Sequence, residues 1–307
     1  MTRLPNAAAQ QAAGGNGMKR RNIVMVLFTL PVVILYSIFF LLPMLLGVYY
    51  SMTNWTGINP NYKFIGLDNY IKVLQDNRFY EAIFFNFKYT FFLVIGTVVL
   101  SLLIALALNQ LKRSTTAFRS IYFIPAVLSL VTVGLIWNEL YLRAFPVIGK
   151  ALGIEALSTS VLANPSLAMY GILIVNLWQG CAVPTVLFIA GLQSVPADLY
   201  EAATIDGANA WQKFRKITVP FLIPILTMVV ITSVKGGLTI FDYIKAMTDG
   251  GPAQATEAIG ILIYRHAMSE GKFAQSVAES MILFVIVAIV SFITIKLTSN
   301  KQVGGDE

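Results

Sequence analysis

The sequence predicts an all-α integral membrane protein, and its composition and hydropathy pattern carry that prediction. Apolar residues make up 57% of the 307 residues and charged residues only 12%, whereas soluble domains average roughly 45–50% and 25%. The mean hydropathy is +0.72. Six segments are long and apolar enough to cross a bilayer as helices, which takes about 20 residues each. Because open strand edges have no partners in lipid, we expect six transmembrane helices.

The six expected spans are residues 23–50, 85–108, 121–140, 167–192, 219–240 and 280–297. The first contains Pro31 and Pro43, which can kink a helix or mark its entry into the membrane. The apolar core of a signal peptide has about 7–15 residues. The run here is longer, so we expect an uncleaved span. Residues 1–21 are expected to be a disordered tail, residues 22–300 the six-span domain, and residues 301–307 a second tail.

The distribution of basic residues predicts the orientation. Loops on one side of the expected spans carry tight clusters of Lys and Arg: residues 19–21, 112–119, 213–216 and 296–301. The three loops on the other side are longer and mix basic residues with carboxylates. Positive clusters beside span ends mark the cytoplasm. We therefore expect both termini and the loop 193–218 to be cytoplasmic, and we attribute the net charge of +7 to these loops rather than to nucleic-acid binding.

A polar segment, residues 200–208, separates the fourth and fifth expected spans. Pro196 suits the first turn of a helix, and Asp198 complements the positive helix end. A short helix over residues 197–205 is therefore expected. Gly207 can adopt a left-handed conformation and end that helix.

A second helix is expected directly after this corner. Asn209 can cap it, and Trp211, Phe214 and Ile217 recur at intervals of three. Pro220 then allows the chain to enter the next span. The resulting helix, corner and helix can protrude as a rigid knob. Spacing alone also fits an ordinary cytoplasmic loop whose aromatic residues rest on lipid headgroups.

The same segment carries a recognisable motif. Glu201-Ala202-Ala203, followed at fixed spacing by Gly207, Ile217 and Val219-Pro220, resembles the EAA loop of bacterial ABC-importer permeases, in which Leu usually stands at the position of Val219. Further segments resemble the carbohydrate-uptake members of that family: residues 51–55, 64–70, 122–125, 241–242 and 250–252. The likeness extends from about residue 31 to residue 297.

The resemblance implies a type I ABC importer permease fold in a bacterial cytoplasmic membrane. The loop 194–220 would dock into a separate cytoplasmic ATPase, with Glu201 facing a basic group there and Gly207 preserving the corner. The implied coupling residues are Glu201, Ala202, Ala203, Asp206, Gly207, Ala208, Trp211, Phe214 and Pro220. The implied partners are two ATPase subunits that bind ATP and magnesium, a second similar permease, and an extracellular or periplasmic solute-binding protein. No cofactor is expected on this chain.

Enzyme chemistry is poorly supported by the sequence. The pairs Gly149-Lys150 and Gly271-Lys272 lack the remainder of a phosphate-binding P-loop, so ATP must be bound elsewhere. His266 is the only histidine, which argues against a zinc site or a Ser-His-Asp triad. We expect it to be a solvated or interfacial loop residue. An intramembrane enzyme would need polar groups clustered at one depth, and none is evident.

An ion-coupled secondary transporter is also disfavoured. Such carriers place carboxylates or histidines inside their spans, whereas Glu139, Asp242 and Glu279 are expected at span ends. The pattern fits a neutral, polar cargo such as a sugar or oligosaccharide.

The candidates for a solute path are aromatic, amide, hydroxyl and charged residues near the fourth and fifth spans: Asn176, Trp178, Gln179, Lys235, Thr239, Asp242 and Tyr243. Aromatic rings stack on sugar faces, and amides satisfy sugar hydroxyls. Asn176 and Gln179 fit hydrogen bonding between helices equally well. Lys235 is expected to pair with Asp242 or to extend toward the interface, although it could instead meet a sugar acid or a glycerol-phosphate-type solute.

Overall fold

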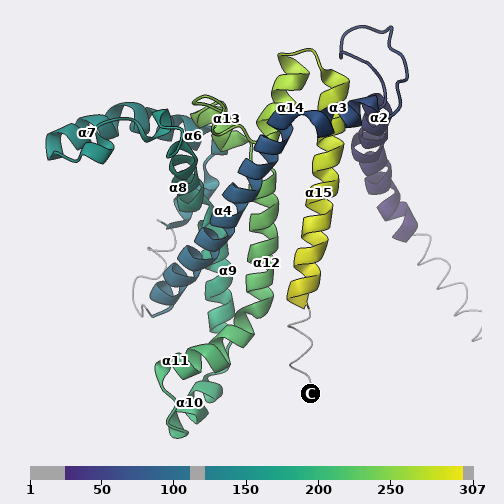
Figure 1. Cartoon of the computed structure of the whole chain (residues 1–307). Helices are drawn as coiled ribbons and strands as arrows, with labels where there is room; N and C mark the ends of the chain where they lie inside the picture. The colour runs from purple at the N-terminus through teal and green to yellow at the C-terminus, as the bar shows by residue number, and fades with distance from the viewer. Residues whose placement is uncertain (1–24, 111–121, 300–307) are drawn as a thin grey trace, which may run out of the picture.

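The computed structural model describes residues 25–110 and 122–299, which are almost entirely helical (Figure 1). The expected tails, residues 1–21 and 301–307, lie outside the described residues. Residues 25–36 are helical. The elements that follow are η1 (Ser37–Leu41), α2 (Leu42–Ser51), α3 (Asp68–Gln75), α4 (Asn77–Asn109), α6 (Leu130–Glu139), η2 (Leu140–Ala144), α7 (Phe145–Leu152), η3 (Glu155–Leu157), η4 (Val161–Ala163), α8 (Ala168–Gly180), α9 (Ala182–Gln193), α10 (Ala197–Ile205), α11 (Ala210–Lys213), η5 (Phe214–Thr218), α12 (Val219–Leu238), α13 (Asp242–Met247), α14 (Ile259–Met268) and α15 (Phe273–Ser299).

Four continuous helices in this part of the chain are long and apolar enough to cross a membrane: Met25–Ser51, Asn77–Asn109, Ala210–Leu238 and Phe273–Lys296. They correspond to the first, second, fifth and sixth expected spans. The fourth expected span corresponds to α8 and α9, which qualify together and meet at an angle of 46°. The last span begins earlier than expected, so Glu279 lies inside its helix.

The third expected span, residues 121–140, is not one helix. Residues 122–127 are helical, and the chain is then interrupted before α6 begins. Ser129 adopts an extended conformation at this break, which suits a residue that precedes a helix. From there α6, η2 and α7 run on and project sideways from the bundle (Figure 1). The described residues thus contain four or five membrane-length helices, and the count of six is not confirmed.

Close approach of small residues holds the helices around α4 together. A Cβ atom on Gly237 of α12 would lie 2.5 Å from Oγ1 of Thr90 on α4, and one on Gly191 of α9 would lie 2.3 Å from Ile225 of α12. Glycine lets helix backbones meet at such distances. Buried Asn86 adds a polar link, because its amide donates to the carbonyl of Leu238 at 2.8 Å and accepts from the amide of Ile259 at 2.9 Å.

The two ends of the bundle differ. At one end α10 and α11 extend beyond the other helices, whereas α3, α13 and α14 lie at the opposite end (Figure 1). Since α12 runs between these ends, it connects the α10–α11 corner with the middle of the molecule.

Candidate functional site

The corner formed by α10 and α11 agrees with its expected local structure. Helix α10 begins directly after Pro196 and has Asp198 in its first turn. It ends before Gly207, whose φ of +73° is strained for any residue with a Cβ atom. The prediction of a helix over residues 197–205 that is ended by a left-handed glycine is confirmed.

Helix α11 begins with a capping box. The side chain of Asn209 accepts from the amide of Gln212 at 2.9 Å, and the side chain of Gln212 accepts from the amide of Asn209 at 2.8 Å. From this cap the chain remains helical through η5 into α12, so the fifth span starts at the corner itself. The Trp211 and Phe214 rings stack with centroids 5.7 Å apart.

Most of the expected coupling residues are accessible. Glu201, Ala202, Asp206, Gly207, Trp211 and Pro220 are exposed, and Ala203, Ala208 and Phe214 are half-buried. Two large apolar side chains stand out, since Ile205 is 87% exposed and Trp211 is 66% exposed. Large apolar side chains at a protruding corner, next to a carboxylate and a left-handed glycine, form a surface suited to a protein partner.

Within the described residues, two side-chain hydrogen bonds join α10 to the helix that follows. The Tyr200 hydroxyl lies 2.8 Å from Oγ1 of Thr218, and the Lys213 ammonium donates to Oγ1 of Thr204 at 2.8 Å. The first pair is partly buried and the second is exposed. We call residues 194–220 with these two links the elbow.

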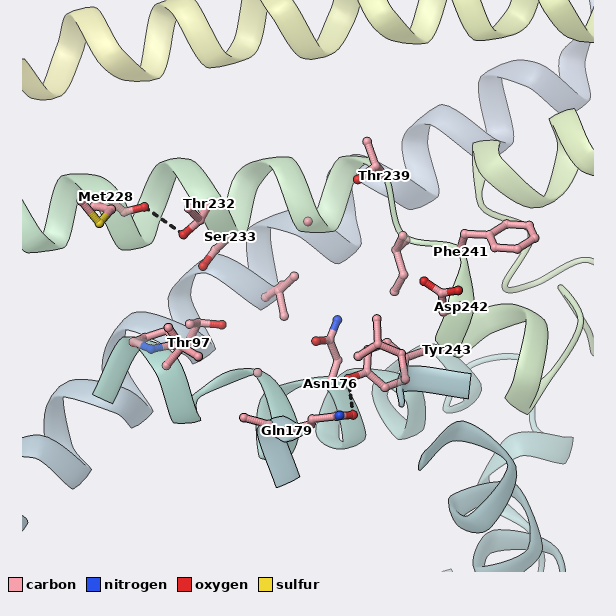
Figure 2. Close-up of a pocket in the computed structure, with 18 of the residues that line it drawn as sticks. Thr97, Asn176, Gln179, Met228, Thr232, Ser233, Thr239, Phe241, Asp242 and Tyr243 are labelled. Carbon is pink, nitrogen blue, oxygen red and sulfur yellow. Dashed lines mark hydrogen bonds between the residues drawn. The ribbon is translucent and has the colours of Figure 1, made fainter. Parts of the chain in front are cut away.

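A cavity of about 650 Å³ lies between α4, α8, α9, α12 and α13 (Figure 2). Five of the expected path residues line it: Asn176, Gln179, Thr239, Asp242 and Tyr243. Three hydroxyl side chains that were not expected also line it, namely Thr97, Thr232 and Ser233. The spacing of Thr232, Ser233 and Gly236 places them on one face of α12, so helical periodicity could have identified them.

Gln179 links three segments at the wall of this cavity. Its Nε2 donates to the carbonyls of Pro125 and Leu128, both at 2.9 Å, and its Oε1 accepts from the Tyr243 hydroxyl at 2.7 Å (Figure 2). The two carbonyls lie where the third expected span is interrupted. Because both amide hydrogens are engaged, Gln179 matches the interhelical interpretation rather than a free solute ligand.

Asn176 and Asp242 are more available for a solute. Asn176 donates to the buried Tyr89 hydroxyl at 2.8 Å, which leaves its carbonyl oxygen at the cavity. Asp242 is half-buried in the first turn of α13, and no cation of the described residues pairs with it. Figure 2 places both side chains at the edge of the cavity.

Trp178 and Lys235, also expected on the path, do not line this cavity. Trp178 instead packs edge-on against Trp137, with ring centroids 5.7 Å apart. Lys235 is exposed, and the expected pairing with Asp242 is absent from the ion pairs of the described residues. The interpretation that Lys235 extends toward the interface is the one that agrees with its exposed position.

The prediction of a solvated loop histidine is wrong. His266 lies on α14, is 1% exposed, and has Nδ1 at 2.6 Å from Oε1 of Glu279 on α15. Helix α15 begins before the expected span, and this brings the glutamate beneath α14. Within residues 25–110 and 122–299, no group of three or more His, Cys, Asp or Glu side chains could hold a metal.

Comparisons with known proteins agree with the motif. No protein-family model matches the chain. It is 42% identical over 276 residues to the multiple sugar-binding transport system permease protein MsmF of Streptococcus mutans, covering 90% of this chain and 95% of that protein. It is 31% identical over 272 residues to the trehalose/maltose transport system permease protein MalF of Thermococcus litoralis, covering 88% and 92%.

The fold is also similar to a solved structure. A chain of a bacterial alginate ABC transporter, crystallised with an alginate pentasaccharide-bound periplasmic protein, matches with a TM-score of 0.81 and 20% identity. The match covers 92% of this chain and 96% of that chain.

Proposed function

Because this chain belongs to the permease family of carbohydrate ABC importers, we propose that it carries a sugar or oligosaccharide across a bacterial cytoplasmic membrane, driven by a separate ATPase. The observation that carries this proposal is 42% identity to a sugar-transport permease along 90% of the chain, with an exposed elbow at the matching motif.

The cargo is a neutral saccharide rather than an acidic one. The cavity offers hydroxyl and amide groups on an apolar wall, and its volume of about 650 Å³ lies within the about 300–1,000 Å³ of typical ligand sites. The alternative cargo, a sugar acid or a glycerol-phosphate-type solute, depended on Lys235, which lies outside the cavity. The carboxylate of Asp242 at the cavity edge disfavours an anion further.

The elbow docks into a cleft of a cytoplasmic ATPase. Ile205 and Trp211 provide exposed apolar anchors, while Glu201 and Asp206 provide charge for a basic partner. Two ATPase subunits bind ATP and magnesium, and their closure moves two elbows, one on this chain and one on a second similar permease. A solute-binding protein delivers the cargo from outside, as the complex of the alginate transporter illustrates.

This arrangement requires the elbow and both termini to be cytoplasmic, which thiol labelling tests. Cys181 is buried and is the only cysteine, so Cys181→Ala gives a thiol-free background. In cells that express this chain without its ATPase subunits, Ile205→Cys in that background should react with an impermeant maleimide only after the cells are opened. Ile58→Cys, at a position 92% exposed in the loop before α3, is the matched control and should react in intact cells. Reaction of Ile205→Cys in intact cells would contradict the proposal.

The cargo is tested in proteoliposomes that contain the assembled transporter and its binding protein. ATP-dependent uptake of a labelled neutral oligosaccharide should be inhibited by other neutral oligosaccharides and not by uronic-acid oligomers. Equal inhibition by uronic-acid oligomers would favour the acidic cargo.

A further inference from the structure

Helix α10 is joined to the rest of the molecule through two corners. One is the segment Ser194–Pro196, which links it to α9, and the other is the left-handed Gly207, which links it to α11. Helix α10 itself buries no side chain. Because its backbone is joined to the rest of the molecule only at these two corners, the side-chain contacts of α10 with the helix that follows determine how firmly its angle is held.

The Tyr200–Thr218 hydrogen bond is such a contact. The Tyr200 hydroxyl reaches from α10 to Thr218, the last residue before α12, at 2.8 Å. Thr218 is buried and Tyr200 is half-buried, so water competes less with this bond than with the exposed Lys213–Thr204 bond. The bond closes a triangle whose other two sides are α10 and the α11–η5 helix.

From Thr218 a continuous helix leads to the cavity. Helix α12 begins at Val219, packs tightly on α9 through Leu222 and Gly191, and carries Thr232, Ser233 and Gly236 on the cavity wall. A displacement of α10 that is passed to Thr218 therefore moves cavity-lining groups directly.

We propose that the Tyr200–Thr218 hydrogen bond is the brace that transmits movement of α10 to α12, which makes both residues positioning residues for transport. The inference rests on the proposed docking of the elbow to an ATPase. It concerns what happens after docking, because the Tyr200 hydroxyl points back to its own chain.

The test uses the complete transporter in proteoliposomes with three single variants and one double variant. Tyr200→Phe and Thr218→Val each remove one hydroxyl and keep the shape, whereas Thr218→Ser keeps the hydroxyl. Both deletions should lower the amount of solute transported per ATP hydrolysed by about three- to tenfold, the range expected for one hydrogen bond. Thr218→Ser should stay near wild type, and the double deletion should be no worse than either single one.

One further readout and one control variant separate a role in transmission from a role in docking or helix stability. Co-purification of the ATPases should be unchanged in every variant, since docking itself does not use the brace. Thr227→Val removes a hydroxyl of α12 that bonds only to Ile223 of its own helix, and it should transport like wild type.

Normal solute transport per ATP in both deletion variants would overturn the brace. Loss of ATPase co-purification in those variants would overturn it as well, because the bond would then serve assembly. Failure of the proposed function is distinguishable, since the wild-type elbow would then bind no ATPase.

Discussion

Arg78 and Glu257 lie 179 positions apart in the sequence, yet the Arg78 guanidinium donates to both carboxylate oxygens of Glu257, at 2.6 Å and 2.8 Å. Arg265 donates to the same carboxylate, and Arg78 also pairs with Glu270 at 2.9 Å. This network joins the first turn of α4, the loop that precedes α14, and the corner between α14 and α15. It fixes the end of the molecule opposite to the elbow.

Substitution of Glu257 should destabilise this end. The carboxylate is 4% exposed, so Glu257→Gln leaves two guanidinium groups with a weaker acceptor and should lower the free energy of unfolding by about 1.5–3 kcal/mol. Thermal unfolding of the purified protein in detergent measures the change. Glu139→Gln is the control, because its pair with Arg143 is exposed and one helical turn apart, and it should cost less than about 0.5 kcal/mol. Equal effects of the two substitutions would refute this assignment.

Two adjacent glycines of α12 should respond in opposite directions to the same substitution. A Cβ atom on Gly237 would clash with Thr90 of α4, whereas one on Gly236 meets nothing within 4 Å. Gly237→Ala should therefore cost about 1–3 kcal/mol through overpacking. Gly236→Ala should be neutral or stabilising by up to about 1 kcal/mol, since alanine favours helix. The same unfolding assay compares them, and a stable Gly237→Ala would show that α4 and α12 pack less closely.

The role of Gln179 is tested without any solute. Gln179→Leu removes the side-chain donor from the carbonyls of Pro125 and Leu128 and the acceptor from the Tyr243 hydroxyl, and it should cost about 1–3 kcal/mol. Tyr243→Phe removes one of these bonds and should cost less. The double substitution should cost less than the sum of the two single ones, because they share a bond. Wild-type stability of Gln179→Leu would point to a solute ligand instead of a structural link.

Acid should weaken the corner between α14 and α15. Lys272 first, and then Arg78, lower the pKa of Glu270 to about 2, from the usual 4.5 of a glutamate side chain. A lowered pKa contributes stability above pH 4.5 that is lost as the pH falls toward 2, because the unfolded chain takes up the proton first. The unfolding temperature of wild type should therefore fall more steeply over this range than that of Glu270→Gln. Exposed Glu155 provides the control, and Glu155→Gln should follow the wild-type curve.

How much the sequence could predict depends on whether a feature is local. The elbow was predictable because Pro196, Gly207 and Asn209 act within a few residues, through backbone restriction, left-handed φ and helix capping. The resemblance of residues 201–220 to the EAA loop indicated an ATPase as the partner of the elbow, whereas the spacing of its residues alone also fitted an ordinary loop.

Other features required tertiary contacts. The third expected span is mostly apolar, and its interruption is visible only in the structure, where Gln179 donates to the carbonyls of Pro125 and Leu128 at the break. His266 falls between two expected spans, so a loop was expected there, but the segment forms α14 and Glu279 of α15 lies against the imidazole. The Arg78–Glu257 pair spans most of the chain, so no sequence window contains both residues. Trp178 was expected on the solute path because of its residue type. Its position on α8 instead places its ring against Trp137, outside the cavity.

On the proposed function, the elbow conveys the work of the ATPase to the membrane helices. The most direct measurement is ATP hydrolysis by the reconstituted transporter, with and without solute-loaded binding protein, for Gly207→Pro and Glu201→Lys. Proline cannot adopt the positive φ of Gly207, and lysine reverses the charge offered to the partner. Gly153→Pro is the control outside the elbow, because Gly153 has a similar φ of +67° and, as at Gly207, an added Cβ atom would meet nothing within 4 Å. Membrane insertion should be normal in all three variants, and solute-stimulated hydrolysis should be lost only in the two elbow variants. Full stimulation in both elbow variants would contradict this role of the elbow.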